Sequence, residues 1–135
     1  MGASGTGPFE NDGALDLCGD LEDLTPAGVH ARLRQALTVV AEADEEEYVD
    51  VDLGQEAVAA AAIVAARRSG DTATLEAEDL DGLIPADLDG LTALAAAALT
   101  RVLAENSELS ALWSESSLLD DQWRASIQAL LTTLR

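Results

Sequence analysis

The amino-acid sequence predicts an all-α fold, a compact bundle of about five or six helices preceded by an irregular glycine-rich arm. Apolar residues make up 48% of the chain but aromatic residues only 3%, so the core has to consist mainly of Leu, Ala, Val and Ile. Apolar residues recur at the three-to-four-residue spacing of amphipathic helices. Runs of β-branched and aromatic residues, which are typical of strands, are nearly absent.

The length of the chain indicates one domain over residues 1–135. A chain of this size hides roughly two-thirds of its unfolded surface on folding, which is enough for one hydrophobic core. Cys18 is the only cysteine and His30 the only histidine. The sequence therefore excludes an intrachain disulfide and a cysteine-based zinc site.

The first expected elements are an arm and a helix. Residues 1–10 carry three glycines and a proline, which indicates an irregular arm, and Phe9 is its expected anchor on the core. Asn11 or Asp12 then provides the N-cap of a helix that reaches about Leu24.

A second helix is expected to begin at Thr25-Pro26, where a hydroxyl N-cap precedes proline at the first helical position. One apolar stripe runs along it, formed by Val29, Leu33, Leu37 and Val40. We expect this helix to end within the acidic residues 41–52, because adjacent carboxylates near a helix C-terminus oppose the helix dipole.

The third helix is expected to be the most buried one. Asp52 and Gln55 have the spacing of a capping box, which predicts a helix from this point to Arg68. Residues 57–66 are mostly alanine, and alanine lets a neighbouring helix approach closely. Gly70 is placed to end the helix.

The rest of the chain divides into a loop and three helices. Residues 71–90 contain glycine, proline and five aspartates. This composition predicts a second acidic segment, a loop with at most short helical turns. A fourth helix follows over 91–103, and Asn106-Ser107-Glu108 marks a break and a new N-cap before a short turn of helix. Ser117 and Asp120 form a second capping box before the last helix.

The charge of the chain narrows the classes of partner. There are 26 Asp and Glu residues against 7 basic ones, and the net charge is −19. Such a charge repels nucleic-acid phosphates and anionic lipids, so we expect neither a nucleic-acid partner nor a membrane partner. Cationic partners, metal ions and basic protein surfaces stay open, as does the alternative that the acidity only keeps the chain in solution.

The acidic segment between the second and third helices is the candidate partner-binding site. Its residues are Asp44, Glu45, Glu46, Glu47, Tyr48 and Asp50. It can be a solvated charged face, a docking surface for a basic partner or a set of oxygen ligands for a hard cation. The EF-hand pattern is not met, because counting from Asp50 places Gln55 at the sixth position and Ala61 at the twelfth. Tyr48 favours docking, since tyrosine combines contact area with a polar tip.

The N-terminal residues carry a recognisable motif, Met1-Gly2-x-x-Gly5-x-Gly7-Pro8-Phe9-Glu10-Asn11-Asp12-x-Ala14-x-Asp16. It resembles the opening of the DUF4259 domain, a bacterial family of uncharacterised small proteins. Residues 101–113, followed by Trp123-Arg124, are similar to the C-terminal half of that family. The chain departs from it at Ser4, where tryptophan is typical. The resemblance marks Gly5, Gly7, Phe9, Asn11, Asp12 and Asp16 as family-motif residues and implies no activity.

No residue is assigned a catalytic role, and no cofactor is expected. Asp12 and Asp16 lie one helical turn apart, which suits either dipole complementation at the helix start or the binding of a cation or guanidinium group. His30 and Cys18 are interpreted as a boundary histidine and a buried small thiol. No nucleophile motif is present, and the glycine arm matches neither the P-loop nor the dinucleotide fingerprint.

These observations favour a protein-binding module for a basic partner, of the inhibitor or immunity type. The alternatives are a divalent-cation-binding protein and an enzyme that uses paired carboxylates such as Asp12 and Asp16. No N-terminal signal peptide is visible, so we expect the cytoplasm. The oligomeric state stays open.

Overall fold

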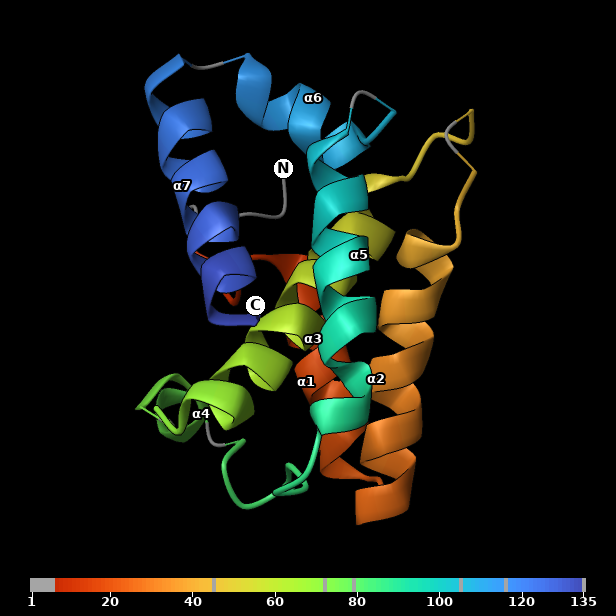
Figure 1. Ribbon diagram of the computed structural model, residues 1–135, viewed down its shortest axis with the longest axis vertical. Coiled ribbons are helices and arrows are strands. Elements are labelled where there is room, and N and C mark those ends of the chain that lie inside the picture. Colours follow the sequence, from red (N-terminus) through yellow and green to blue (C-terminus); the bar gives the residue numbers. More distant parts are fainter. Residues whose placement is uncertain are drawn as a thin grey trace.

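The computed structural model describes residues 7–44, 46–71, 73–78, 80–104, 106–115 and 117–134. These residues form α-helices and one short 3-10 helix, without a strand, so the predicted all-α fold is confirmed (Figure 1). In chain order the elements are α1 (Asp12–Glu22), α2 (Pro26–Ala41), α3 (Val51–Ser69), α4 (Ala73–Ala77), η1 (Asp89–Leu91), α5 (Thr92–Leu103), α6 (Glu108–Ser114) and α7 (Ser117–Leu134).

The described chain thus has seven α-helices, one more than the upper end of the expected number. The additional helix is α4, five residues long, which lies together with the start of η1 in residues 71–90, where a loop with at most short helical turns was expected. Residues 1–6, which make up most of the expected glycine-rich arm, lie outside the described part. No described helix is long and apolar enough to cross a membrane.

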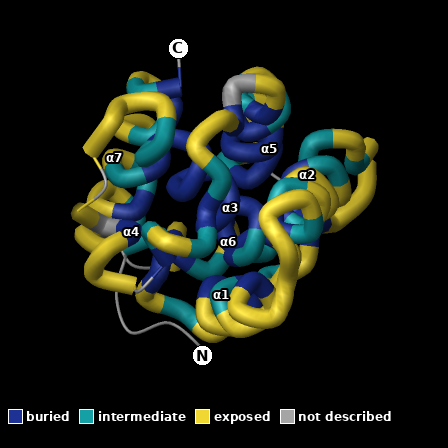
Figure 2. Tube along the Cα trace, turned by 90° about the horizontal axis from the view of Figure 1, so that it is seen from below, coloured by how far each residue is buried: buried dark blue, intermediate teal, exposed yellow. Residues whose placement is uncertain are grey.

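Helix α3 occupies the centre of the bundle and contacts α1, α2, α5, α6 and α7 (Figure 1). Every residue from 57 to 65 is buried, and Figure 2 shows α3 among the buried parts of the trace. Most of these residues are alanine, whose methyl side chain lets helices pack against α3 on several sides. The expectation that α3 is the most buried helix is therefore confirmed.

Local capping explains where most helices begin. Asn11 caps α1, because its side-chain oxygen accepts from the amide of Ala14 at 2.8 Å. Thr25 caps α2 and Ser107 caps α6 in the same way, as the sequence predicts. Helix α7 begins at Ser117, and the capping interaction predicted for that side chain falls outside the described part of the chain.

The predicted start of α3 is wrong by two residues. Asp50 is the N-cap, and its carboxylate accepts from the amide of Leu53 at 3.0 Å. The supposed capping-box partner Gln55 is buried, and its side-chain oxygen accepts from the amide of Gly13 in α1 at 3.1 Å. The end of α3 is as expected, since Gly70 follows it in the left-handed conformation, with φ of 80°.

The N-terminal residues pack onto the bundle through Phe9, which is buried in the core, as the sequence analysis expected. The core also contains both tryptophans, Trp113 and Trp123. Helix α2 is joined to its neighbours by Arg32, whose guanidinium group lies 3.2 Å from Asp20 in α1 and 2.6 Å from Glu56 in α3. One arginine therefore joins three helices.

Candidate functional site

The acidic segment forms an exposed loop between α2 and α3. We call residues 42–50 the acidic loop; Glu45 lies outside the described residues. The side chains of Asp44, Glu46, Glu47 and Asp50 are exposed, and Tyr48 is 59% exposed. Val49 is buried and anchors the loop to the core. The described candidate residues thus share one loop and face solvent.

The backbone of the acidic loop is held by Arg101, a buried residue in the last turn of α5. Its guanidinium group donates to the carbonyl oxygens of Ala43 at 3.4 Å, Asp44 at 3.0 Å and Asn106 at 3.1 Å. It also donates to the carbonyl oxygen of Glu47. A single buried cation therefore fixes the loop from beneath, and each hydrogen bond from a charged donor is stronger than a neutral one.

A second set of contacts joins the acidic loop to the start of α6. Val49 and Ser107 form an isolated parallel bridge. The amide of Val49 donates to the carbonyl of Asn106 at 3.0 Å, and the amide of Glu108 donates to the carbonyl of Val49 at 2.8 Å. The carboxylate of Glu108 then accepts from the amide of Val51 at 2.8 Å. The end of the loop is consequently tied to the α5–α6 junction through the backbone of Val49 and the amide of Val51.

Several arginines compensate carboxylates outside the acidic loop. Arg32, Arg67 and Arg124 form ion pairs, and their partners are the carboxylates of Asp20, Glu56, Asp81 and Asp120. Within the described residues, no ion pair includes Asp44, Glu46 or Glu47, since Arg101 contacts carbonyl oxygens beneath them. The loop therefore presents its negative charges to solvent.

The role of Arg101 was not predicted from the sequence. Its four carbonyl partners lie between 5 and 58 residues away, and three of them belong to the acidic loop. The only local signal is that Arg101 is the single charged residue in the apolar segment 91–103. A cation isolated in an apolar segment indicates a buried polar partner, because unpaired burial of a charge is costly.

The family-motif residues have mostly structural positions. Phe9 is buried, Asn11 caps α1, and the carbonyl of Gly7 accepts from the amide of Glu10 at 3.2 Å in a turn. Asp12 and Asp16 are exposed on α1. Gly5 lies outside the described residues.

The start of α1 lies against the start of α3. Besides the hydrogen bond to Gln55, a Cβ atom added to Gly13 would lie 3.1 Å from the carbonyl oxygen of Asp52. The motif that contains Asp12 is therefore brought to the helix that begins directly after the acidic loop. This contact joins the two regions that the sequence analysis singled out.

Two further features are the placement of potential metal ligands and the state of the Cys18 thiol. In the ranges that the structure describes, no three or more His, Cys, Asp and Glu residues gather in a way that could hold a metal ion. Burial, assisted by the negative charges of Glu78 and Glu22, raises the pKa of the Cys18 thiol from 9.0 to about 11. The thiol is therefore protonated at neutral pH and is a poor nucleophile.

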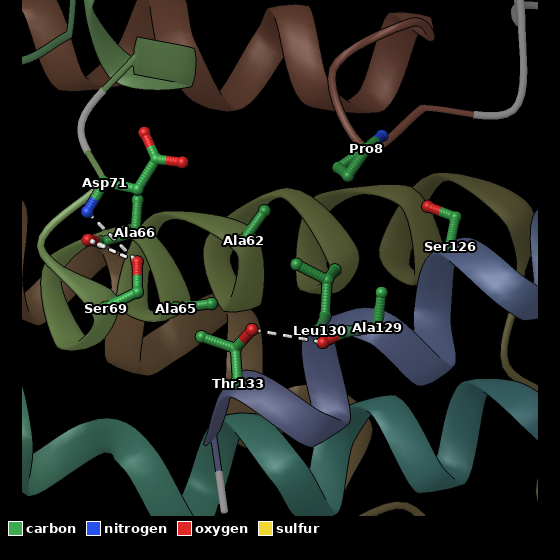
Figure 3. Close-up of a pocket in the computed structure, with 10 residues that line it drawn as sticks. All are labelled: Pro8, Ala62, Ala65, Ala66, Ser69, Asp71, Ser126, Ala129, Leu130 and Thr133. Atoms are coloured by element: carbon green, nitrogen blue, oxygen red, sulfur yellow. Dashed lines mark hydrogen bonds between the residues drawn. The ribbon is translucent and has the colours of Figure 1, made fainter.

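A groove between α3 and α7 was not anticipated from the sequence (Figure 3). We call it the α3–α7 groove; its volume is about 310 Å³. Small side chains dominate its lining, which consists of Pro8, Ala62, Ala65, Ala66, Ser69, Asp71, Ser126, Ala129, Leu130 and Thr133. The lining residues of α3 lie on one face of that helix, and those of α7 lie on one face of theirs. This spacing is present in the sequence, but it indicates a groove only when the two helices are known to be neighbours.

Together these features define an acidic all-helical domain that is built around one alanine-rich helix and carries a braced acidic loop. The chain belongs to the family described as "Domain of unknown function (DUF4259)", whose model matches residues 2–126. No curated protein and no solved structure matches the chain.

Proposed function

We propose that this protein is a binding module that docks a basic partner protein on its acidic loop, in the manner of an inhibitor or immunity protein. The observation that carries the proposal is the bracing of the loop by Arg101. Exposed carboxylates alone are common on protein surfaces. Here three carbonyl contacts to a buried guanidinium hold the backbone that carries Asp44, Glu46, Glu47 and Tyr48, and a fourth joins the same guanidinium to Asn106.

Pre-organisation matters because binding has to offset the entropy lost when a flexible loop becomes ordered. A loop held in one conformation avoids most of that cost. Tyr48 adds a large exposed side chain in the middle of the negative charges, and tyrosine is enriched among residues that dominate binding energies. The loop therefore combines charge, an aromatic contact and a fixed backbone.

The net charge of −19 supports the same proposal at long range. A strongly negative surface attracts a basic protein and speeds its association, and salt screens this attraction. We place the protein in the cytoplasm of a bacterium, where a lone thiol such as Cys18 stays reduced.

The test is a pull-down with the tagged protein at low salt, followed by elution with rising salt. One variant carries Asp44→Asn, Glu46→Gln and Glu47→Gln in the acidic loop. The matched control carries Glu76→Gln, Glu115→Gln and Asp121→Asn, which removes the same charge from exposed positions outside the loop.

We expect one basic protein to bind the unchanged chain and the control in near-stoichiometric amount, and to be lost with the loop variant. Equal recovery with both variants would show that only the overall charge attracts proteins and would refute the docking site. Recovery of no specific protein would also count against it.

A further inference from the structure

We propose that the α3–α7 groove binds a small organic cation, a primary alkylammonium whose hydrocarbon chain lies on the alanine floor and whose ammonium group meets the carboxylate of Asp71. The groove is formed by the C-terminal halves of α3 and α7, whereas the acidic loop precedes α3. This inference is therefore independent of the docking function proposed above.

The shape of the groove follows from short side chains on two neighbouring helices. Helix α3 contributes Ala62, Ala65 and Ala66 at helical spacing, and these methyl groups are too short to fill the space beside α7. A volume of about 310 Å³ lies at the lower end of the range of roughly 300–1,000 Å³ found for small-molecule sites. The floor and the side chains of Leu130 and Pro8 suit a short apolar body.

The hydroxyl groups of Ser69 and Thr133 act as acceptors toward a ligand in the groove. The hydroxyl of Ser69 donates its proton to the carbonyl of Ala66 at 3.3 Å, and that of Thr133 donates to the carbonyl of Ala129 at 3.2 Å. Each hydroxyl has only one proton to donate, so both oxygens keep a lone pair for a ligand, although that of Ser69 also accepts from the amide of Asp71 at 3.2 Å. Toward these two oxygens a ligand has to supply donors, and an ammonium group supplies three.

The charge at the groove has one sign. Asp71 lines it, and Figure 3 shows this carboxylate turned toward the space between Asp71 and Pro8. One carboxylate oxygen accepts from the amide of Ala73 at 3.2 Å, which leaves the other oxygen for a ligand. No arginine is among the described residues that line the groove, and the net charge of −19 concentrates cations around the protein. Charge complementarity therefore selects a cation.

The test is a titration followed by amide chemical shifts in two-dimensional NMR spectra of the full chain. Hexylammonium chloride is compared with hexanol and with sodium hexanoate at equal ionic strength. We expect saturable shifts confined to residues 62–71 and 126–133 with the amine, weaker ones with the alcohol and none with the carboxylate. Equal binding of alcohol and amine, shifts spread over the whole protein, or no saturable shift would each overturn the proposal.

Two variants locate the contacts. Asp71→Asn removes the charge but keeps an oxygen that accepts from the amide of Ala73, and we expect it to weaken amine binding by about fivefold. Ala129→Leu places a larger side chain at an exposed position of the groove and should abolish binding. Asp121→Asn, which removes the same charge as Asp71→Asn, lies on α7 outside the groove and should bind as the unchanged chain does. Unaltered binding by either groove variant would refute the assignment.

Discussion

The backbone amide of Gly13 donates a buried hydrogen bond of 3.1 Å to the side-chain oxygen of Gln55, 42 residues further along the chain. This bond satisfies an amide in the first turn of α1 that has no partner within its own helix. It also brings the two helix starts so close that only glycine fits, because a Cβ atom at position 13 would lie 2.6 Å from the Cβ atom of Gln55.

The first prediction concerns this contact. Gly13→Ala should lower the free energy of unfolding by about 1–3 kcal/mol, because an added methyl group overpacks the interface between α1 and α3. Urea denaturation measures the change. Gly19→Ala is the control, since no atom lies within 4 Å of a Cβ added there, and it should be neutral or stabilising by up to about 1 kcal/mol. A similar effect of both changes would contradict the close contact.

The second prediction concerns the cation beneath the acidic loop. Arg101→Met should destabilise the protein by at least about 2 kcal/mol, because carbonyl oxygens lose their charged donor. Hydrogen exchange should also become faster at the amides of Val49 and Val51, which bond to the α5–α6 junction. Arg34→Met, at an exposed position of α2, is the control and should leave both readouts unchanged. Unaltered exchange in Arg101→Met would show that the loop does not depend on this residue.

The third prediction concerns the pH dependence of Cys18. Its thiol pKa is raised from 9.0 to about 11, so alkylation by iodoacetamide should accelerate with pH up to about 11 in the folded protein and only to about 9 in urea. Because the unfolded chain releases this proton first, Cys18 lowers the stability of the fold as pH rises from 9.0 to about 11. Glu78→Gln removes one contributing charge and should lower the pKa. Equal alkylation profiles in the two states would contradict the raised pKa.

The fourth prediction concerns salt. The 26 Asp and Glu residues far outnumber the 7 basic ones, so the net charge of −19 leaves strong repulsion among carboxylates. Raising sodium chloride from low to physiological concentration should therefore increase the melting temperature by about 2–5 °C, as measured by circular dichroism. A fall in melting temperature would mean that ion pairs such as those of Arg32 outweigh the repulsion among carboxylates.

Helix positions could be predicted because the signals that set them are local. The N-caps of α1, α2 and α6 each bond to an amide three residues further on, so a few neighbouring residues are sufficient to recognise them. Helix α3 shows the limit of this reasoning. Asp50 and Asp52 are equally good N-cap residues by type, and the spacing of Asp52 and Gln55 favoured the wrong one. The side chain of Gln55 is engaged in α1 instead.

Part of the candidate site could likewise be predicted from the sequence, and part of it depends on the tertiary structure. The sequence by itself identified the acidic segment and Tyr48, because charge and composition are properties of the chain. The long-range contacts of Arg101 and the groove between α3 and α7 arise only from folding. Their groups lie far apart along the chain, and the packing of the helices around α3 alone decides which of them meet. Local capping and hydrophobic periodicity determine where the helices form. Burial in the shared core determines how the helices pack and which side chains come into contact.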